Sequence, residues 1–196
     1  TSEDRNTKME MLAATPARRE RLNEQLRRQW DFAEVAPATL AAGRLLVESI
    51  DDDGLLSSDL AGIAAQSASA EGGPFTEQAL AEALSVVQNH LEPPGVGARD
   101  IRESLLLQLE AKLDPDRWIE APLPEDRAAI HDAIQIVRDH YEDLLENRLP
   151  RIVQRSGLSL ERVEAAKERL RRLTTSPGRD LTDDDPERVI PDVMVE

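Results

Sequence analysis

Apolar residues recur every three or four positions along most of this chain, and this spacing constrains the fold more than any other feature of the sequence. Leu22, Leu26 and Trp30 give the first example, with charged residues on the remaining faces. This is the period of an amphipathic helix, and runs with the two-residue period of a β-strand are missing. The frequent residues Leu, Ala, Glu and Arg favour helices, and only 3% of the chain is aromatic. The sequence therefore predicts an all-α fold.

Turn and cap signals divide the pattern into separate helices. Pro37 suits a first helical turn, Thr76 is a good N-cap, and Ser57 or Ser58 can cap a short helix. We expect helices over residues 16–30, 37–50, 57–66, 76–91, 101–113, 125–147, 149–156 and 160–173. In the long helix over 125–147, the residues expected to face inward are Ile130, Ile134, Val137, Tyr141, Leu144 and Leu145.

An elbow at residues 92–100 separates two of these helices. Pro93 and Pro94 stop the preceding helix, and Gly95 and Gly97 can adopt the positive φ values that an abrupt change of direction needs. Asp100, with Glu103 three residues later, is typical of a helix start. We interpret the elbow as mainly architectural.

Prolines among charged residues at 114–124 predict a hinge between two helical units. The first unit, 16–113, is expected to be a helical bundle. The second, 125–179, is expected to be a tri-helical subdomain of helix-turn-helix type, with a tight turn at Gly157. Residues 1–15 lack periodicity and are expected to be disordered, and 180–196 is expected to be a linker.

Charge is distributed unevenly along the chain, whose net charge is −15. Residues 31–150 hold 24 acidic and 8 basic side chains, whereas 151–179 hold 8 basic and 3 acidic ones. A small basic patch lies within 16–30, and 180–196 is acidic. The overall balance argues against nonspecific adhesion to nucleic acid, which depends on Lys and Arg displacing counterions.

Known catalytic and ligand-binding motifs do not fit this sequence. Gly95-Val-Gly97 lacks the third glycine and the preceding strand of a dinucleotide site, and no P-loop sequence follows it. Asp51-Asp52-Asp53-Gly54 resembles a calcium loop, but the twelfth position would be Leu60 instead of a bidentate glutamate. The three histidines lack metal-site spacing and are expected to be surface or partly packed residues. We therefore expect no enzyme activity, no cofactor and no metal.

The cellular setting is indicated by absences in the sequence. The chain contains no cysteine, shows no signal-peptide pattern near residue 1, and has no apolar stretch approaching the ~20 residues of a membrane span. A cytoplasmic protein without a membrane partner is the expectation.

The spacing of Val153 and Gly157 favours a helix-turn-helix, and basic residues surround it. The following helix also carries Glu161, Glu164 and Glu168, which can form helical ion pairs with those basic residues. Two interpretations stay open: a structural or protein-binding unit, or a unit that contacts DNA through phosphates more than base edges.

Four stretches of the sequence resemble one known family. The longest is Leu91-Glu-Pro-Pro-Gly-Val-Gly-Ala-Arg-Asp-Ile-Arg-Glu-Ser-Leu-Leu-Leu-Gln-Leu, which is similar to the signature of the sigma-54 family of bacterial transcription initiation factors, within their domain that binds core RNA polymerase. The others are Ile50-Asp-Asp-Asp-Gly-Leu-Leu, Gly157-Leu-Ser-Leu-Glu-Arg-Val, and Ser176-Pro-Gly-Arg179 followed by Val189-Ile-Pro-Asp-Val-Met-Val. They occur in the family's order and span roughly residues 35–196.

The resemblance implies a docking module without catalysis that seats the sigma factor on core RNA polymerase. The family also has an amino-terminal segment that responds to an activator ATPase, and a carboxy-terminal domain that binds promoter DNA. Neither matches this chain, so we expect an excised core-binding domain whose last residues begin the connection to the DNA-binding portion.

Candidate contact residues follow from the signature and from the basic second unit. The candidates for polymerase binding are Arg99, Asp100, Arg102 and Gln108. The candidates for contact with phosphate or polymerase are Arg155, Arg162, Arg169, Arg172 and Arg179. An internal clamp between Arg99 and a neighbouring acid is an equally good interpretation. The alternative function is a stand-alone helix-turn-helix DNA-binding regulator.

Overall fold

The computed structural model describes residues 22–115 and 123–183, and within these ranges its regular structure is helical apart from two isolated β-bridges. This confirms the all-α prediction. The first helical segment covers residues 22–31. The elements that follow are α2 (Pro37–Glu48), α3 (Leu60–Gln66), the 3-10 turn η1 (Ser67–Ser69), α4 (Glu77–His90), α5 (Ile101–Ala111), α6 (Pro124–Asp139), α7 (Tyr141–Leu145), α8 (Leu149–Ser156), α9 (Leu160–Leu170) and α10 (Pro177–Asp183). The predicted disorder at 1–15 and most of the predicted linker at 180–196 lie outside the described residues.

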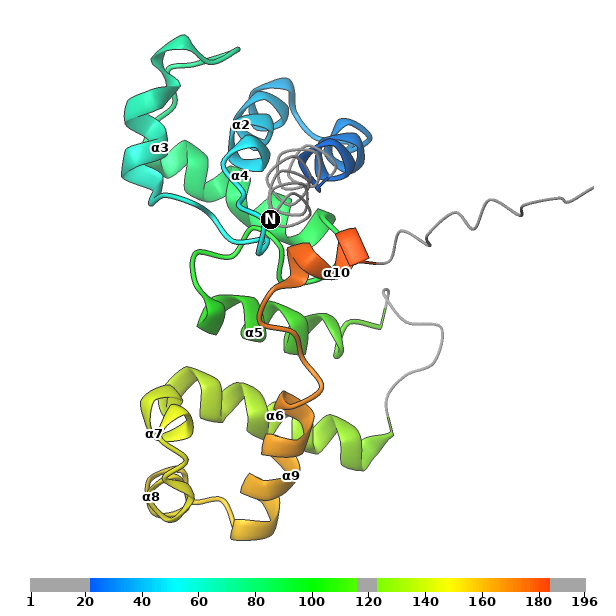
Figure 1. Ribbon diagram of the computed structural model, residues 1–196, viewed down its shortest axis with the longest axis vertical. Helices are drawn as coiled ribbons and strands as arrows, with labels where there is room; N and C mark the ends of the chain where they lie inside the picture. The colour runs from blue at the N-terminus through cyan, green and yellow to red at the C-terminus, as the bar shows by residue number, and fades with distance from the viewer. Residues whose placement is uncertain (1–21, 116–122, 184–196) are drawn as a thin grey trace, which may run out of the picture.

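A first apolar cluster joins the helices of the amino-terminal half (Figure 1). Leu22, Leu26 and Trp30, whose spacing predicted the first helix, are at most 1% exposed. The Trp30 ring lies directly on Gly43 of α2, where an added Cβ would be 2.1 Å from the ring. Its indole nitrogen donates a hydrogen bond to the carbonyl of Leu40 over 2.9 Å. A glycine in α2 thus makes room for the largest buried side chain.

The short helix α3 is capped differently from the sequence expectation. Asp59, and not Ser57 or Ser58, is its N-cap, because the Asp59 carboxylate accepts from the backbone N–H of Gly62 over 2.8 Å. Ser57 instead pairs with the carbonyl of Ser49. The predicted Thr76 cap of α4 is confirmed, since its hydroxyl accepts from the N–H of Ala79 over 3.1 Å.

A second apolar cluster joins α5, α6, α8 and α9. Leu105 and Leu109 of α5 are buried in this cluster together with Ile136, Ile152 and Val163. The buried face of α5 therefore packs on the second half of the chain, although the sequence assigned this helix to the first unit. In Figure 1, α5 lies between the upper helices and α6 to α9. The hinge predicted at 114–124 lies mostly outside the described residues.

The long helix expected at 125–147 is interrupted. α6 ends at Asp139, His140 takes a non-helical conformation with φ −135° and ψ 28°, and α7 begins at Tyr141. This break shifts the helical register, so Leu145, expected to face inward, is 68% exposed. The predicted tight turn at Gly157 is confirmed by its left-handed φ of +73°.

Candidate functional site

Three stretches that are far apart in the sequence meet at one place, which we call the junction: the turn 51–56, residues 92–98 of the elbow, and the segment 174–179. The N–H of Gly97 donates to the carbonyl of Gly54 over 2.8 Å, and the N–H of Leu56 donates to the carbonyl of Ala98 over 2.8 Å. The N–H of Gly178, at the start of α10, donates to the carbonyl of Asp53 over 3.0 Å. Three of the four stretches that carry the family resemblance thus contact each other.

The junction requires glycine where backbones approach closely. Gly54, Gly95 and Gly97 all have positive φ, at +90°, +97° and +77°, so the conformation expected of the elbow glycines is confirmed. An added Cβ on Gly178 would lie 2.6 Å from the nitrogen of Gly54. Arg179 forms an ion pair with Asp53 at 2.7 Å on the rim of the same contact. The chain therefore returns from α9 to the first cluster, where Leu181 packs.

Gln108 ties α5 to the returning segment. Its side-chain amide donates to the carbonyl of Thr174 over 2.8 Å, and its amide oxygen accepts from the N–H of Thr174 over 3.1 Å. The same amide donates to the hydroxyl of Ser104 over 3.2 Å, and Gln108 is only 8% exposed. The predicted polymerase contact is thus mostly buried and satisfied within the chain.

Arg102 joins α5 to the end of α6. Its guanidinium donates to the carbonyl of Val137 over 3.0 Å and to the carbonyl of Arg138. It also lies over the ring of Tyr141, 5.9 Å from its centroid. Burial and the nearby charge of Asp100 raise the pKa of Tyr141, and Arg102 opposes this effect. Arg102 satisfies the last carbonyls of a helix that the break at His140 leaves free.

The other two polymerase candidates form the start of α5. The Asp100 carboxylate accepts from the N–H of Glu103 over 2.8 Å, as a helix cap. Glu103 in turn accepts from the backbone N–H of Arg99 and pairs with its guanidinium, both at 2.5 Å. Arg99 thus pairs with a neighbouring acid, but on the surface and not inside the bundle. Contact of Arg99 and Asp100 with polymerase stays a prediction.

Two of the basic candidates of the second unit, Arg162 and Arg169, have partners on α6. Arg162 binds buried Asp132 of α6 through two hydrogen bonds of 2.8 and 2.6 Å, and this contact raises the pKa of Arg162. Arg169 pairs with Asp126, also on α6. Arg172, which follows the end of α9, pairs with Glu168 of that helix at 3.7 Å. The helical pairing predicted for this region holds for Glu168, but Arg162 and Arg169 instead fasten α9 to α6.

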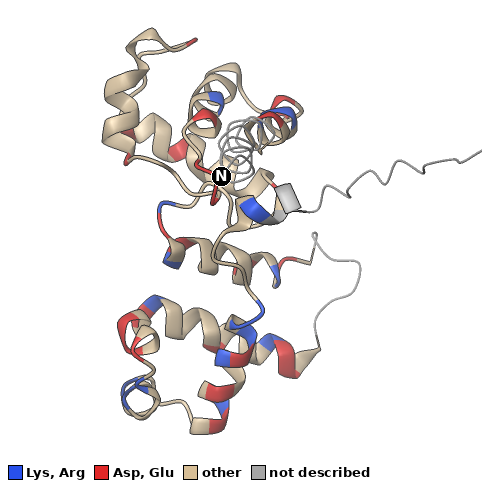
Figure 2. Cartoon of the chain, viewed as in Figure 1, with Lys and Arg blue, Asp and Glu red and all other residues tan. Residues whose placement is uncertain are grey.

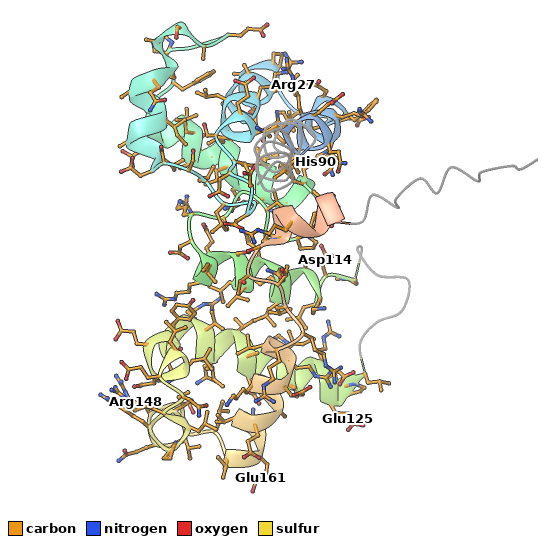
Figure 3. All side chains as sticks on the ribbon, in the orientation of Figure 1. Arg27, His90, Asp114, Glu125, Arg148 and Glu161 are labelled. Carbon is orange, nitrogen blue, oxygen red and sulfur yellow. The ribbon has the colours of Figure 1, made fainter. Side chains whose placement is uncertain are left out.

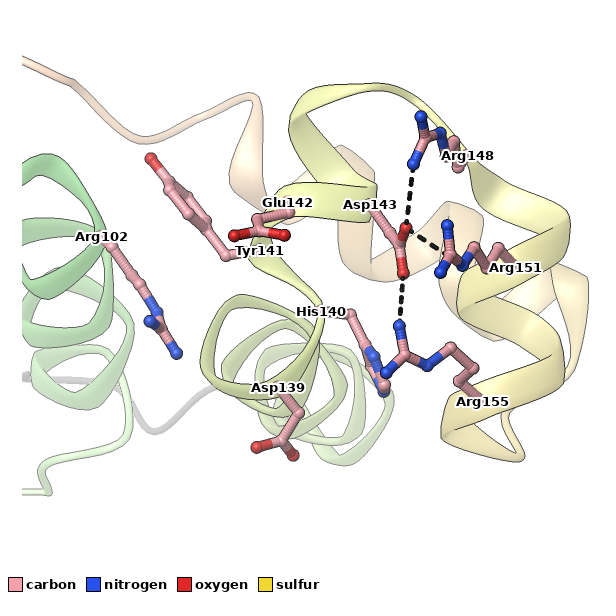
Figure 4. Close-up of a pocket in the computed structure, with 9 residues that line it drawn as sticks. All are labelled: Arg102, Asp139, His140, Tyr141, Glu142, Asp143, Arg148, Arg151 and Arg155. Carbon is pink, nitrogen blue, oxygen red and sulfur yellow. Dashed lines mark hydrogen bonds and ion pairs between the residues drawn. The ribbon is translucent and has the colours of Figure 1, made fainter.

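Arg155 belongs to a cluster on α8 that the sequence did not reveal (Figure 4). Arg148, Arg151 and Arg155 surround the carboxylate of Asp143, with closest nitrogen to oxygen distances of 3.8, 3.5 and 3.2 Å. The Asp143 side chain is 7% exposed, whereas those of the three arginines are 50 to 54% exposed. They border a hollow of about 300 Å³. The break at His140 turns Asp143 toward α8, and no local pattern predicts that break.

The histidines, the grouping of possible metal ligands and the length of the helices bear on whether the described residues could bind a metal ion or cross a membrane. His90 packs edge-on against Trp30 and is exposed, His131 is exposed, and His140 is partly buried, as expected. Across residues 22–115 and 123–183, no group of three His, Asp or Glu side chains could hold a metal ion. No helix in these ranges is long and apolar enough to cross a membrane.

These features define an all-helical chain with two apolar cores joined by a backbone junction, in which most of the candidate arginines are engaged in internal contacts. Comparison with known proteins identifies its family. The family model described as sigma-54 factor, core binding domain, matches residues 11–196. The chain therefore belongs to the sigma-54 core-binding domain family, which confirms the resemblance seen in the sequence.

Several RNA polymerase sigma-54 factors are similar to this chain. The factor of Acidithiobacillus ferridurans is 32% identical over 91% of the chain, and that of Azotobacter vinelandii is 34% identical over 76%. The factor of Shewanella violacea is 33% identical over 90%. These alignments cover 34%, 27% and 33% of the three relatives. The chain thus spans about a third of the length of the curated relatives it matches.

Proposed function

We propose that this chain is the part of a sigma-54 transcription initiation factor that binds core RNA polymerase, so that the intact factor can direct the enzyme to promoters. The observation that carries the proposal is the match of residues 11–196 to the core-binding domain family. The junction supports it, because the stretches that carry the resemblance hold the two apolar clusters together. A docking module needs such a fixed framework and needs no catalytic residues.

The acidic surface of the first half is the proposed docking face. Residues 22–98 contain 12 acidic and 3 basic side chains, a net charge of −9. All three of those arginines, Arg27, Arg28 and Arg44, lie within 4.0 Å of an acidic side chain of the same bundle. A surface of this charge attracts a basic partner, and complementary charge chiefly raises the association rate and the specificity. The partner surface on core polymerase is therefore proposed to be basic.

Further parts of the proposal concern the intact factor. Promoter DNA and an activator ATPase are proposed to act mainly through segments other than this chain. The protein is proposed to work in the cytoplasm without catalytic activity. The division into units at 16–113 and 125–179 is also retained as a proposal, with α5 packing on the second unit. The rival function, a stand-alone helix-turn-helix DNA-binding regulator, gains no support from the family match.

The test is a titration of labelled core RNA polymerase with the chain and with two charge-reversal variants. One variant replaces the exposed acids Glu34, Glu71 and Glu82 of the first half by lysine, and the control replaces Glu125, Glu142 and Glu164 of the second half by lysine. We expect saturable binding that the first variant weakens at least tenfold more than the control does. Equal affinities for the two variants would refute the acidic docking face, and no binding by the unaltered chain would refute the function itself.

A further inference from the structure

The three arginines at α8 carry more positive charge than the acidic side chains paired with them can neutralise. Arg148, Arg151 and Arg155 share the carboxylate of Asp143, and Glu146 pairs with Arg148 alone. Three guanidiniums thus face two carboxylates, and Asp143 is buried beneath them. In Figure 4 the other acids of the hollow, Asp139 and Glu142, lie on the side of Arg102, away from α8. The outer face of α8 is therefore positive within an otherwise acidic molecule.

Asp143 holds these guanidiniums in place without using up their donors. Each guanidinium has five N–H donors in a planar fork, and the contacts with Asp143 engage only part of them. Since each side chain stays about half exposed, the remaining donors face solvent. An arginine already held by an ion pair loses less conformational freedom when it binds an anion. The arrangement is suited to binding a second, larger anion.

The position of α8 indicates which anion fits. α8, the left-handed turn at Gly157 and α9 form the helix-turn-helix unit, and the first helix of such a unit crosses the DNA backbone when the unit lies on a duplex. Arg148 and Arg155 are seven positions apart, about 10 Å at ~1.5 Å per helical residue. Phosphates of one strand repeat every ~3.4 Å along the duplex axis. Three guanidiniums over this length can each meet a different phosphate.

The following helix explains why such contact would not read sequence. α9 exposes Glu161 and Glu164 at the positions where a recognition helix would meet base edges. Carboxylates repel the phosphates on either side of a groove, and Arg162 and Arg169, which could offset them, are paired with α6. The charge pattern thus favours contact through α8 and opposes insertion of α9.

We propose that Arg148, Arg151 and Arg155 form a surface that binds the phosphate backbone of duplex DNA without sequence preference, with buried Asp143 positioning the three guanidiniums. This surface would hold DNA beside the second unit whenever the duplex is brought near it. The inference does not depend on polymerase binding by the chain, because the chain itself is tested with DNA.

The experiment measures binding of the chain to a fluorescent random-sequence duplex by anisotropy between about 50 and 200 mM salt. Three phosphate contacts predict a slope of about −2.7 in log affinity against log salt, which is a loss of about 40-fold over this range. The variant R148Q/R151Q/R155Q should lose this salt-dependent binding. The variant D143N keeps all three guanidiniums but removes the carboxylate that positions them, so it should bind DNA several-fold less tightly than the unaltered chain.

The matched control is R27Q/R28Q/R44Q, which removes the same charge from the first half, where Arg27 lies at the opposite end of the molecule from Arg148 (Figure 3). This control should bind DNA as the unaltered chain does. Circular dichroism checks folding, and the variant D143N/R148Q/R151Q/R155Q, which leaves no buried unpaired charge, replaces the triple variant if that one unfolds.

Three outcomes would overturn the proposal. The first is no DNA binding by the unaltered chain at 50 mM salt. The second is equal DNA affinity and salt slope for the α8 variant and the control. The third is an α8 variant that keeps its DNA affinity and loses affinity for core RNA polymerase, because the surface would then bind an acidic protein.

Discussion

Replacing Gln108 by alanine should destabilise the chain by about 2 to 3 kcal/mol. The side chain makes two hydrogen bonds to the backbone of Thr174, and each such bond contributes about 1 kcal/mol net. Gln108 is 8% exposed, so its γ-methylene adds about 0.8 kcal/mol of lost apolar burial. For a chain of this size the loss corresponds to a fall in Tm of roughly 5 to 10 °C.

Urea unfolding followed by circular dichroism measures this change, with Q78A as the control. Gln78 is exposed on α4, and its amide contacts only the neighbouring Glu82 among the bonds described, at 3.2 Å. Q78A should unfold within about 0.5 kcal/mol of the unaltered chain. Gln108 is also a candidate polymerase contact, so measuring both the stability and the polymerase affinity of Q108A separates a structural role from a binding role. A Q108A variant that unfolds like Q78A but binds polymerase poorly would refute the structural role inferred here.

Three further changes test other parts of the structure. The one tyrosine of the chain, Tyr141, should have a pKa above 10 when its ionisation is followed by absorbance at alkaline pH, and D100N should lower that pKa. Because the tyrosine of the unfolded chain ionises at a lower pH than that of the folded chain, stability should fall as the pH rises above 10. A Tyr141 pKa at or below 10 would contradict the packing described. G178A should free α10 from the turn at 51–54, because the added Cβ would clash with the backbone of that turn. The backbone amide of residue 178 should then exchange its hydrogen faster than in the unaltered chain, and an unchanged exchange rate would refute this contact. G43A should cost about 1 to 3 kcal/mol in urea unfolding through its clash with the Trp30 ring, and unchanged stability would refute that close contact.

Local signals explain why the helices could be predicted from the sequence. The four-residue spacing of Leu22, Leu26 and Trp30 reflects burial on one helix face, and the caps at Thr76 and Asp100 form bonds within three residues. The positive φ of Gly97 follows from the need for an abrupt turn. Interactions between residues only a few positions apart leave a pattern in the local sequence, so they can be predicted from it.

The break at His140 shows where such reasoning stops. The apolar pattern continues through Leu144 and Leu145 and predicts a continuous helix. In the structure, however, the guanidinium of Arg102, 35 positions away from Val137, donates hydrogen bonds to the free carbonyls at the end of α6. A contact between distant helices thus decides a local conformation. The same break places Asp143 under the α8 arginines, and the cluster could not be predicted without it.

The assignment of α5 has a similar explanation. Proline content suggested a boundary at 114–124, but the apolar face of α5 is complementary to α6, α8 and α9. The sequence shows that the face exists and does not show which helix covers it. Likewise, the charges on α9 predicted helical ion pairs, and two of its arginines instead bind acids on α6 that lie 30 and 43 positions away. Figure 2 shows acidic and basic residues interspersed over these helices.

Competition for core RNA polymerase tests the central claim most directly. A preformed complex of core polymerase with a labelled full-length sigma-54 factor would be titrated with the unlabelled chain. If the chain is the core-binding domain, it should displace the labelled factor fully and saturably. Failure to displace the factor at chain concentrations far above that of the complex would contradict the proposed function.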